Sequence, residues 1–501
     1  MDTHTPPAAA LRLRRYEELP GPSALPVLGN AHQLRGGASH LKMEQWSREF
    51  GPMYRMRIGK RRVLVVGDHQ IVAQVLRDRP EGFRRTTALE NIWLEMGMKP
   101  GLFVVNGEVW KRQRRMVMSS FDPAHVRRYY PALQQVAAAL DRRWQQAAQQ
   151  GRAIDLQADL MRYTVDTIAG LAFGSQVNTL ASDGDVLQHH LDKIFPALGR
   201  RLLAPLPLWR WWRSAADREL ERGVAEVNKA VDGFIAQARA RLQAEPQRRE
   251  RPQNLLEAML AAADEPGSGI DDAQVSGNVL TMLLAGEDTT ANTIAWMIHL
   301  LWRHPQALAR AIAEVRRVVS DAACPAWDEV GQLDFIEACA HETMRLKPVA
   351  PLLVMQALAD TTLGDVQVPR GMVVTGVMRR DSVSDAHVPR AAEFEPERWL
   401  AAADGAGAPS TSTSAATSAP SATSATSATS ARRISMPFGA GPRICPGRYL
   451  ALLEMKMAMA VLLGRFTIVG VDTPGGGLAD ERLAFAMSPV GLSMRLQALQ
   501  S

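Results

Sequence analysis

The ten residues FGAGPRICPG, numbered 438–447, constrain the fold of this chain more than any other stretch. They place three glycines and two prolines around Cys445, so the loop is rigid and a flat molecule can approach its backbone closely. The following residues, GRYLALLEMKMAMAVLLGRF, have apolar side chains at helical spacing, and Pro446 suits the first position of that helix. We therefore expect Cys445 at a helix N-cap, where backbone N–H groups and the helix dipole favour a thiolate.

Three roles are compatible with a cysteine in such a loop. It can be a buried structural residue, or a nucleophile as in a hydrolase, although no base is aimed at it and the nearest upstream histidine is His387. It can also be an axial thiolate ligand to haem iron, which requires one rigid sulfur without a cysteine or histidine partner. The other cysteines, Cys324 and Cys339, form no CxxC pair, which argues against a disulfide framework and a structural zinc site.

A second constraint is the apolar stretch DDAQVSGNVLTMLLAGEDTTANTIAWMIHLLWRHP, from Asp271 to Pro305. Asp272 can cap its start and Pro305 can stop it, which predicts a helix of about 30 residues through the centre of the protein. In its middle, Asp288 and Thr289 interrupt the apolar pattern. An exposed helical turn would explain them, but the flanking residues are apolar. We therefore expect a buried acid–alcohol pair that relays protons into a central cavity.

A third pattern is a set of charges from two segments. FIEACAHETMRLKP, residues 335–348, predicts a short helix that carries Glu342 and Arg345 on one face, and FEPERW supplies Arg398 downstream. A solvated surface pair is the simpler explanation of Glu342 and Arg345. The alternative is a buried network of one glutamate and two arginines, which would fix local architecture rather than do chemistry.

The rest of the sequence predicts a mainly α-helical protein with small β-sheets. Residues 53–68 predict a hairpin around Gly59, residues 131–260 are mostly helical in spacing, and strands return in residues 361–374. Residues 403–431 are a Ser/Thr/Ala repeat that cannot bury enough apolar surface to offset its ordering entropy. We interpret this repeat as a disordered surface insertion within one unit.

Together, AGEDTT, ETMR, FEPERW and FGAGPRICPG, in this order, resemble the cytochrome P-450 family of haem-thiolate monooxygenases, in its soluble bacterial form. The last matches the family signature F-G-x-G-x-R-x-C-x-G at every fixed position. The resemblance extends from the proline-rich LPGPSALPVLGN near Leu19 to the C-terminus. It implies a tail of residues 1–18 and one catalytic domain of residues 19–501. In this fold, haem lies between the long central helix and the helix that follows the cysteine loop.

The resemblance also implies a role for each motif. Cys445 would be the proximal ligand to the iron of haem b, Asp288 and Thr289 the catalytic acid–alcohol pair, and Glu342, Arg345 and Arg398 a structural network. The implied contacts with the cofactor come from Trp110, Arg114, Phe438, Gly439 and Arg443. The implied substrate pocket is apolar and is lined by Trp93, Met96, Leu284, Ala285, Ala350, Leu352, Leu353 and Met487.

The implied activity is hydroxylation or epoxidation of a lipophilic small molecule with dioxygen. Electrons would come from NAD(P)H through a separate ferredoxin- or flavodoxin-type partner, since no flavin or ferredoxin domain follows the cysteine helix. A haem-binding sensor or carrier without turnover is the alternative. The intact pair of Asp288 and Thr289 favours the enzyme, because a sensor needs no proton relay.

The net charge and the N-terminal sequence indicate which partners and which location to expect. The net charge of +6 and the pI near 9.4 indicate a mildly basic surface. WKRQRR, residues 110–115, is a candidate docking site for an acidic redox partner, and a solvated face explains it equally well. No nucleic-acid-binding module accompanies the charge. The first twenty residues have no long apolar run, so we expect a cytoplasmic monomer without a membrane span.

Overall fold

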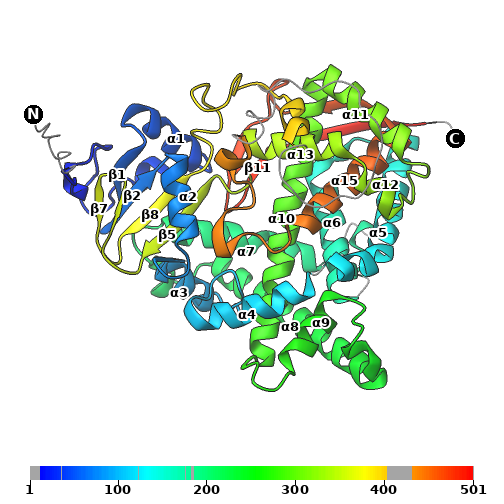
Figure 1. Ribbon diagram of the computed structural model, residues 1–501, viewed down its shortest axis with the longest axis horizontal. Coiled ribbons are helices and arrows are strands. Elements are labelled where there is room, and N and C mark those ends of the chain that lie inside the picture. Colours follow the sequence, from blue (N-terminus) through cyan, green and yellow to red (C-terminus); the bar gives the residue numbers. More distant parts are fainter. Residues whose placement is uncertain are drawn as a thin grey trace, which may run out of the picture.

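A long helix, α10 (Asp272–Arg303), runs through the helical part of the protein (Figure 1). Its half from Thr290 to Leu301 is buried on all sides, which explains why the sequence is apolar all round. The cap is Asp271, and not Asp272 as predicted. Its carboxylate accepts a hydrogen bond from the backbone N–H of Gln274, whose own side chain accepts from the Asp271 backbone.

The structure is a computed structural model that describes residues 12–34, 36–121, 123–174, 177–181, 186–402 and 431–499. Within these ranges α10 packs against α6, α8, α13 and α15. The helices of this part are α4 (Gly107–Ser120), α5 (Pro123–Gln149), α6 (Leu156–Thr167), α7 (Val186–Leu203), α8 (Ala215–Ala244), α9 (Leu255–Ala263), α11 (Pro305–Val318), α12 (Trp327–Gly331), α13 (Asp334–Leu346) and α15 (Arg448–Arg465). The short 3-10 turns η7 (Pro396–Ala402) and η8 (Gly441–Arg443) lie on the segment that leads to α15.

A sheet-rich part lies beside the helical part (Figure 1). Its sheet has the strand order β1-β2-β8-β5-β3, and β2 pairs with β8 in parallel. The predicted hairpin around Gly59 is confirmed, since β1 and β2 are antiparallel with Met53 opposite Val66. The elements are β1 (Met53–Ile58), β2 (Arg61–Val66), β3 (Phe83–Arg84), β5 (Leu352–Ala357), β8 (Val373–Val377), α1 (Ser39–Glu49), α2 (His69–Arg77) and α3 (Thr87–Glu95).

Three smaller sheets complete the described strands. In one of them the C-terminal strand β12 (Ser493–Ala498) is central, between β4 (Ile154–Asp155) and β9 (Phe466–Asp472). The other two are the pair of β6 (Thr361–Leu363) with β7 (Val366–Val368) and the pair of β10 (Glu481–Leu483) with β11 (Met487–Pro489). The predicted fold class, mainly α-helical with small sheets, is confirmed.

Both predicted segment boundaries shift by a few residues. Arg14 pairs with Asp365, and the buried Tyr16 donates a hydrogen bond from its hydroxyl group to the Met56 carbonyl, so the packed chain starts before residue 19. The repeat predicted as a disordered insertion lies outside the described residues apart from Ala431. Ala431 is fully buried against Ala338 and Trp399, because it begins a helical turn, so packing resumes one residue earlier than predicted.

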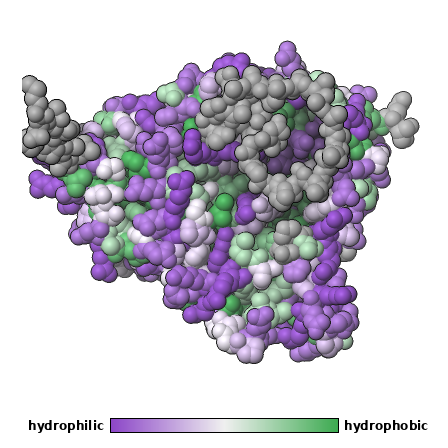
Figure 2. All heavy atoms as spheres, viewed as in Figure 1, coloured by the Kyte–Doolittle hydropathy of each residue, from purple (hydrophilic) through white to green (hydrophobic). Residues whose placement is uncertain are grey.

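The face shown in Figure 2 is mostly hydrophilic, with hydrophobic residues gathered towards its middle. Among the helices of the described ranges, none combines the length and the apolar character that crossing a lipid bilayer requires.

Candidate active site

The loop around Cys445 is held by its own backbone. The Cys445 N–H donates to the Phe438 carbonyl at 3.0 Å. The helix begins at Arg448 with Gly447 as its N-cap, so the predicted N-cap position of Cys445 and first-turn position of Pro446 were wrong. Burial raises the pKa of the Cys445 thiol. The Gly447 backbone, Arg114 and Arg448 lower this pKa, but they do not outweigh burial.

Helix α4 contacts the cysteine loop through residues that were predicted from the sequence to bind the cofactor. Arg114 Nη2 donates to the Ile444 carbonyl at 2.8 Å, directly before Cys445. The Arg443 guanidinium lies 4.6 Å from the centre of the Trp110 ring, and its Nη2 donates to the Val105 carbonyl at 2.7 Å. Three residues predicted to hold the cofactor, Trp110, Arg114 and Arg443, therefore meet at the cysteine loop.

Two further arginines, Arg79 and Arg85, lie close to Arg443 and were not predicted. Burial, together with repulsion by neighbouring arginines, lowers the pKa of Arg79 and of Arg443 to about 9. Burial lowers the pKa of Arg85 to about 10. The buried Nε atoms of Arg85 and Arg443 have no hydrogen-bond partner among the described residues. This donor set is suited to an anion such as a carboxylate.

The acid–alcohol pair lies on α10 where the helix is less buried. Thr289 Oγ1 donates to the Ala285 carbonyl at 2.7 Å, the back-bonding that bends helices. Asp288 is half-buried, less than predicted, and its Oδ1 accepts from Asn292 Nδ2 at 2.5 Å. Ala285 itself is exposed, between the buried Leu284 and Glu287. This turn of α10 is therefore less buried than the half of the helix from Thr290 to Leu301.

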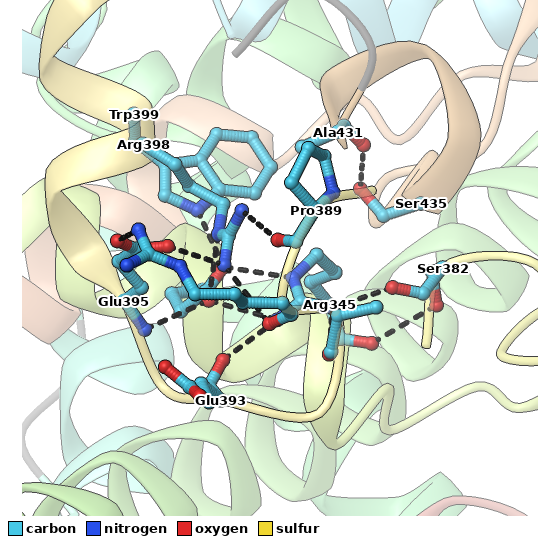
Figure 3. Close-up of polar contacts among 12 residues, drawn as sticks. Arg345, Ser382, Pro389, Glu393, Glu395, Arg398, Trp399, Ala431 and Ser435 are labelled. Atoms are coloured by element: carbon cyan, nitrogen blue, oxygen red, sulfur yellow. Dashed lines mark hydrogen bonds and ion pairs between the residues drawn. The ribbon is translucent and has the colours of Figure 1, made fainter. Parts of the chain in front are cut away.

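The three predicted network charges meet in the interior (Figure 3). Arg345 binds Glu342 through two N–H groups, both at 2.8 Å, and Arg398 Nε donates to the same carboxylate at 3.0 Å. The Trp399 indole donates to Glu342 at 2.8 Å. Burial alone would raise the pKa of Glu342, but the hydrogen bond and charge of Arg345 and the charge of Arg398 lower it below its ordinary value. The surface-pair alternative is excluded, because all three side chains are buried.

A second buried carboxyl group, Glu454 on α15, was not predicted. Burial raises its pKa well above the ordinary value, although a hydrogen bond with Thr290 lowers it in part. Thr290 directly follows Thr289, so this hydrogen bond joins α15 to the turn of α10 that carries the predicted pair. A lone acidic residue within the apolar run LLEMKMAMA was the signal that sequence reasoning passed over.

A cavity of about 550 Å³ lies between the large sheet, α3 and the end of α7. Of the eight residues predicted for the substrate pocket, Leu352 lines this cavity. Trp93, Met96, Leu284 and Met487 are buried in the main core instead. Ala285 and Ala350 are exposed, and Leu353 packs against the sheet core. The cavity is lined on its apolar side by Leu89, Phe103, Leu202, Leu203, Leu352 and Phe485, and it also reaches Arg85.

The residues of this region fit an iron porphyrin. Cys445 is a free cysteine whose sulfur would serve as a ligand, and the Nε atoms of Arg85 and Arg443 would serve as donors to carboxylates. Gly439 has φ +76°, and a side-chain Cβ built there would have no neighbour within 4 Å, so a flat ring can approach this backbone. Phe438 is half-buried beside it.

Comparisons with known proteins agree with this arrangement. The cytochrome P-450 family model matches residues 19–493. Carotene epsilon-monooxygenase of Arabidopsis thaliana is 27% identical over 467 residues, which cover 89% of this chain and 80% of that protein. Pentalenene oxygenase of Streptomyces avermitilis is 27% identical over 482 residues, which cover 95% of this chain and 96% of that one. The crystal structure of the cytochrome P450DA heme domain superposes with a TM-score of 0.79 at 24% identity, covering 98% of both chains. This chain therefore belongs to the cytochrome P-450 family and is a P-450 monooxygenase.

Proposed function

We propose that this monooxygenase hydroxylates or epoxidises a lipophilic small molecule, with electrons that originate from NAD(P)H and arrive through a separate ferredoxin- or flavodoxin-type protein. The observation that carries the proposal is the rigid loop of Cys445 together with Arg85 and Arg443, whose buried Nε atoms have no hydrogen-bond partner in the described parts of the chain. Haem b, when bound, supplies the activation of dioxygen.

Each residue of the site has a proposed task. Cys445 would ligate the iron, and Arg85, Arg443 and Arg79 would hold the carboxylates of the porphyrin. Thr289 and Asp288 would hold and pass a proton on this turn of α10, where the Thr289 hydroxyl group donates to the Ala285 carbonyl. Trp110 would keep Arg443 in place by cation–π contact.

The cavity supports an apolar, rigid substrate of the terpenoid type. Phe485 stacks on Phe195 with ring centres 4.6 Å apart and meets Phe103 edge-on at 5.7 Å, so one wall is aromatic and firmly packed. Leu202 and Leu203 close another side. Two relatives carry names that refer to carotene and to pentalenene, both hydrocarbons. A screen of terpenoids for spin-state changes of the haem absorption would test this substrate class.

The proposed docking face for the electron donor is the exposed side of α4. Lys111 and Arg115 are exposed there, and Arg448 contacts the Cys445 carbonyl at 3.2 Å. An acidic partner on this face would lie close to the sulfur ligand. Substitution of Lys111 and Arg115 by Glu should raise the KM for the partner several-fold without changing the haem spectrum. Arg317→Glu, on the exposed side of α11, should leave that KM unchanged.

The sulfur assignment is tested by the absorption spectrum of the reduced protein under carbon monoxide. We expect the band position of thiolate ligation for the native protein and its loss in Cys445→Ser. An unchanged band in Cys445→Ser, or a native band position typical of histidine ligation, would reject the proposal. Product formation with terpenoids in the presence of a ferredoxin system then separates a monooxygenase from a haem carrier.

A further inference from the structure

A cluster of two histidines and one aspartate lies outside the active site. His69 is the first residue of α2, which lies along the large sheet in Figure 1, and Asp381 and His387 lie in the turns after β8. His69 Nδ1 lies 2.9 Å from Asp381 Oδ2, and His387 Nε2 lies 3.6 Å from Asp381 Oδ1. The ligand atoms of all three residues lie within 4.8 Å of one another.

Hydrogen bonding explains only part of this geometry. Asp381 Oδ2 accepts both the backbone N–H and the ring of His69, each at 2.9 Å, so it fixes the start of α2. His387 at 3.6 Å is too far from the carboxylate for a hydrogen bond. Ligand atoms of a tetrahedral zinc ion, with bonds of about 2.0–2.2 Å, lie roughly 3.2–3.6 Å apart. The His387 ring meets the His69 ring edge to face with centres 5.0 Å apart. This contact holds His387 beside the cluster, and its 3.6 Å separation from Asp381 matches the spacing of ligand atoms around a shared ion.

We propose that His69, Asp381 and His387 bind one Zn²⁺ ion, with water at the fourth position. Two imidazole nitrogens and one carboxylate oxygen form a donor set that zinc accepts readily. The Asp381 side chain is 2% exposed, the His69 side chain 13% and the His387 side chain 35%, so the open coordination position faces solvent through His387.

One cation already faces the cluster. Arg380 Nη1 lies 2.5 Å from Asp381 Oδ1, the oxygen nearest to His387. The guanidinium is 26% exposed and can turn towards solvent when an ion takes its place. Arg380 would therefore compete with the metal ion for the Asp381 carboxylate, and this competition can be measured. Removing Arg380 should strengthen metal binding, whereas removing a ligand should weaken it.

The ion would connect two segments that support the cofactor loop. The end of α2 lies against Gly441, whose added Cβ would meet the Leu76 carbonyl at 2.6 Å. Ser382, which follows Asp381, accepts a hydrogen bond from Arg345 at 2.5 Å and belongs to the charge network of Figure 3. Metal binding should therefore raise the melting temperature of the whole protein.

The test is calorimetric titration of Zn²⁺ into haem-loaded, tag-free protein. Cys324 is an exposed thiol, so every variant is made in a Cys324→Ser background to remove adventitious zinc binding. We expect one ion per chain, with affinity reduced about tenfold or more in both His69→Ala and His387→Ala. Arg380→Ala should bind Zn²⁺ more tightly. His32→Ala, a half-buried histidine elsewhere in the chain, should match the parent protein.

Two outcomes would overturn the proposal. One is a parent protein that takes up no Zn²⁺, and the other is unchanged affinity in His387→Ala. Substitution of His387 is a more specific test than substitution of His69. The His387 ring makes no hydrogen bond with Asp381, so its loss should leave the start of α2 in place. The haem spectrum of each variant checks folding independently of metal binding. A rise in melting temperature with Zn²⁺ is expected in the parent protein and not in His387→Ala.

Discussion

The carboxyl group of Glu454 on α15 shares a hydrogen bond with the hydroxyl group of Thr290 on α10, and its pKa lies well above its ordinary value of 4.5 because it is buried. The folded protein therefore keeps this group protonated, whereas the unfolded chain ionises it above pH 4.5. Stability is consequently lost as the pH rises above that value, by up to about 1.4 kcal/mol per pH unit.

Glu454→Gln should remove this pH dependence. We expect the unfolding free energy of the variant, relative to the native protein, to increase as the pH rises above 4.5, until the pH at which the folded protein also ionises Glu454. Urea unfolding at several pH values measures this free-energy difference. Glu397, in an exposed pair with Arg310, provides the control: the unfolding free energy of Glu397→Gln should differ from that of the native protein by the same amount at every pH. A constant difference for Glu454→Gln as well would contradict protonation of this group.

Glu342→Gln should destabilise the protein by about 3–5 kcal/mol, because Arg345 would be left buried without its counter-charge and Arg398 would keep only its pair with the half-buried Glu395. Thermal unfolding of the haem-loaded protein measures this loss. The exposed pair of Arg310 and Glu397 is worth at most about 1 kcal/mol, so Glu397→Gln is again the matched control. Equal melting temperatures for the two variants would show that the buried network adds no stability.

Arg85→Gln should release haem about tenfold faster, as expected for one charge-assisted hydrogen bond to a carboxylate. The same substitution should lower the stability of haem-free protein by at most about 1–2 kcal/mol, since the Nε of Arg85 has no partner in the described chain and the guanidinium loses its contact with the Phe103 ring, 4.6 Å away. Haem transfer to an apoglobin acceptor measures the rate. Arg84→Gln is the control, because Arg84 pairs with Glu90 instead. An unaltered rate of haem release in Arg85→Gln would show that Arg85 does not bind the cofactor.

Thr289→Ala should consume several times more electrons per product molecule than the native enzyme, because proton delivery on α10 would fail. The ratio of NAD(P)H oxidised to product formed measures this coupling. Thr293→Ala is a close control, since Thr293 donates to the Thr289 carbonyl at 2.8 Å in the same way but is buried. If both variants coupled equally well, the relay proposed for Thr289 would be wrong.

Sequence reasoning found the parts of the site that lie in short motifs. Cys445, Glu342 and Arg345 could be predicted because rigid loops and helical spacing fix their surroundings locally. Arg79 and Arg85 could not, since they lie far from Arg443 in the sequence and the chain has 58 lysines and arginines. Only the fold shows which of these cations are buried together.

The predicted pocket residues show a different limit of sequence reasoning. Trp93 and Met487 are both buried, and the Trp93 indole donates to the Lys99 carbonyl at 3.0 Å. Core and pocket residues have the same composition, so the sequence alone does not separate them. Phe103 and Phe485, which line the cavity, are distant in sequence and carry no local signal.

The central place of β12 between β4 and β9 has a consequence for biosynthesis. Residues 493–498 follow both partner strands in the sequence, yet they form the backbone bridge between residues 154–155 and residues 466–472. During translation the facing edges of these two strands must therefore stay open until residues 493–498 have left the ribosome. A truncation before residue 493 would leave both edges permanently bare and should send the product to degradation.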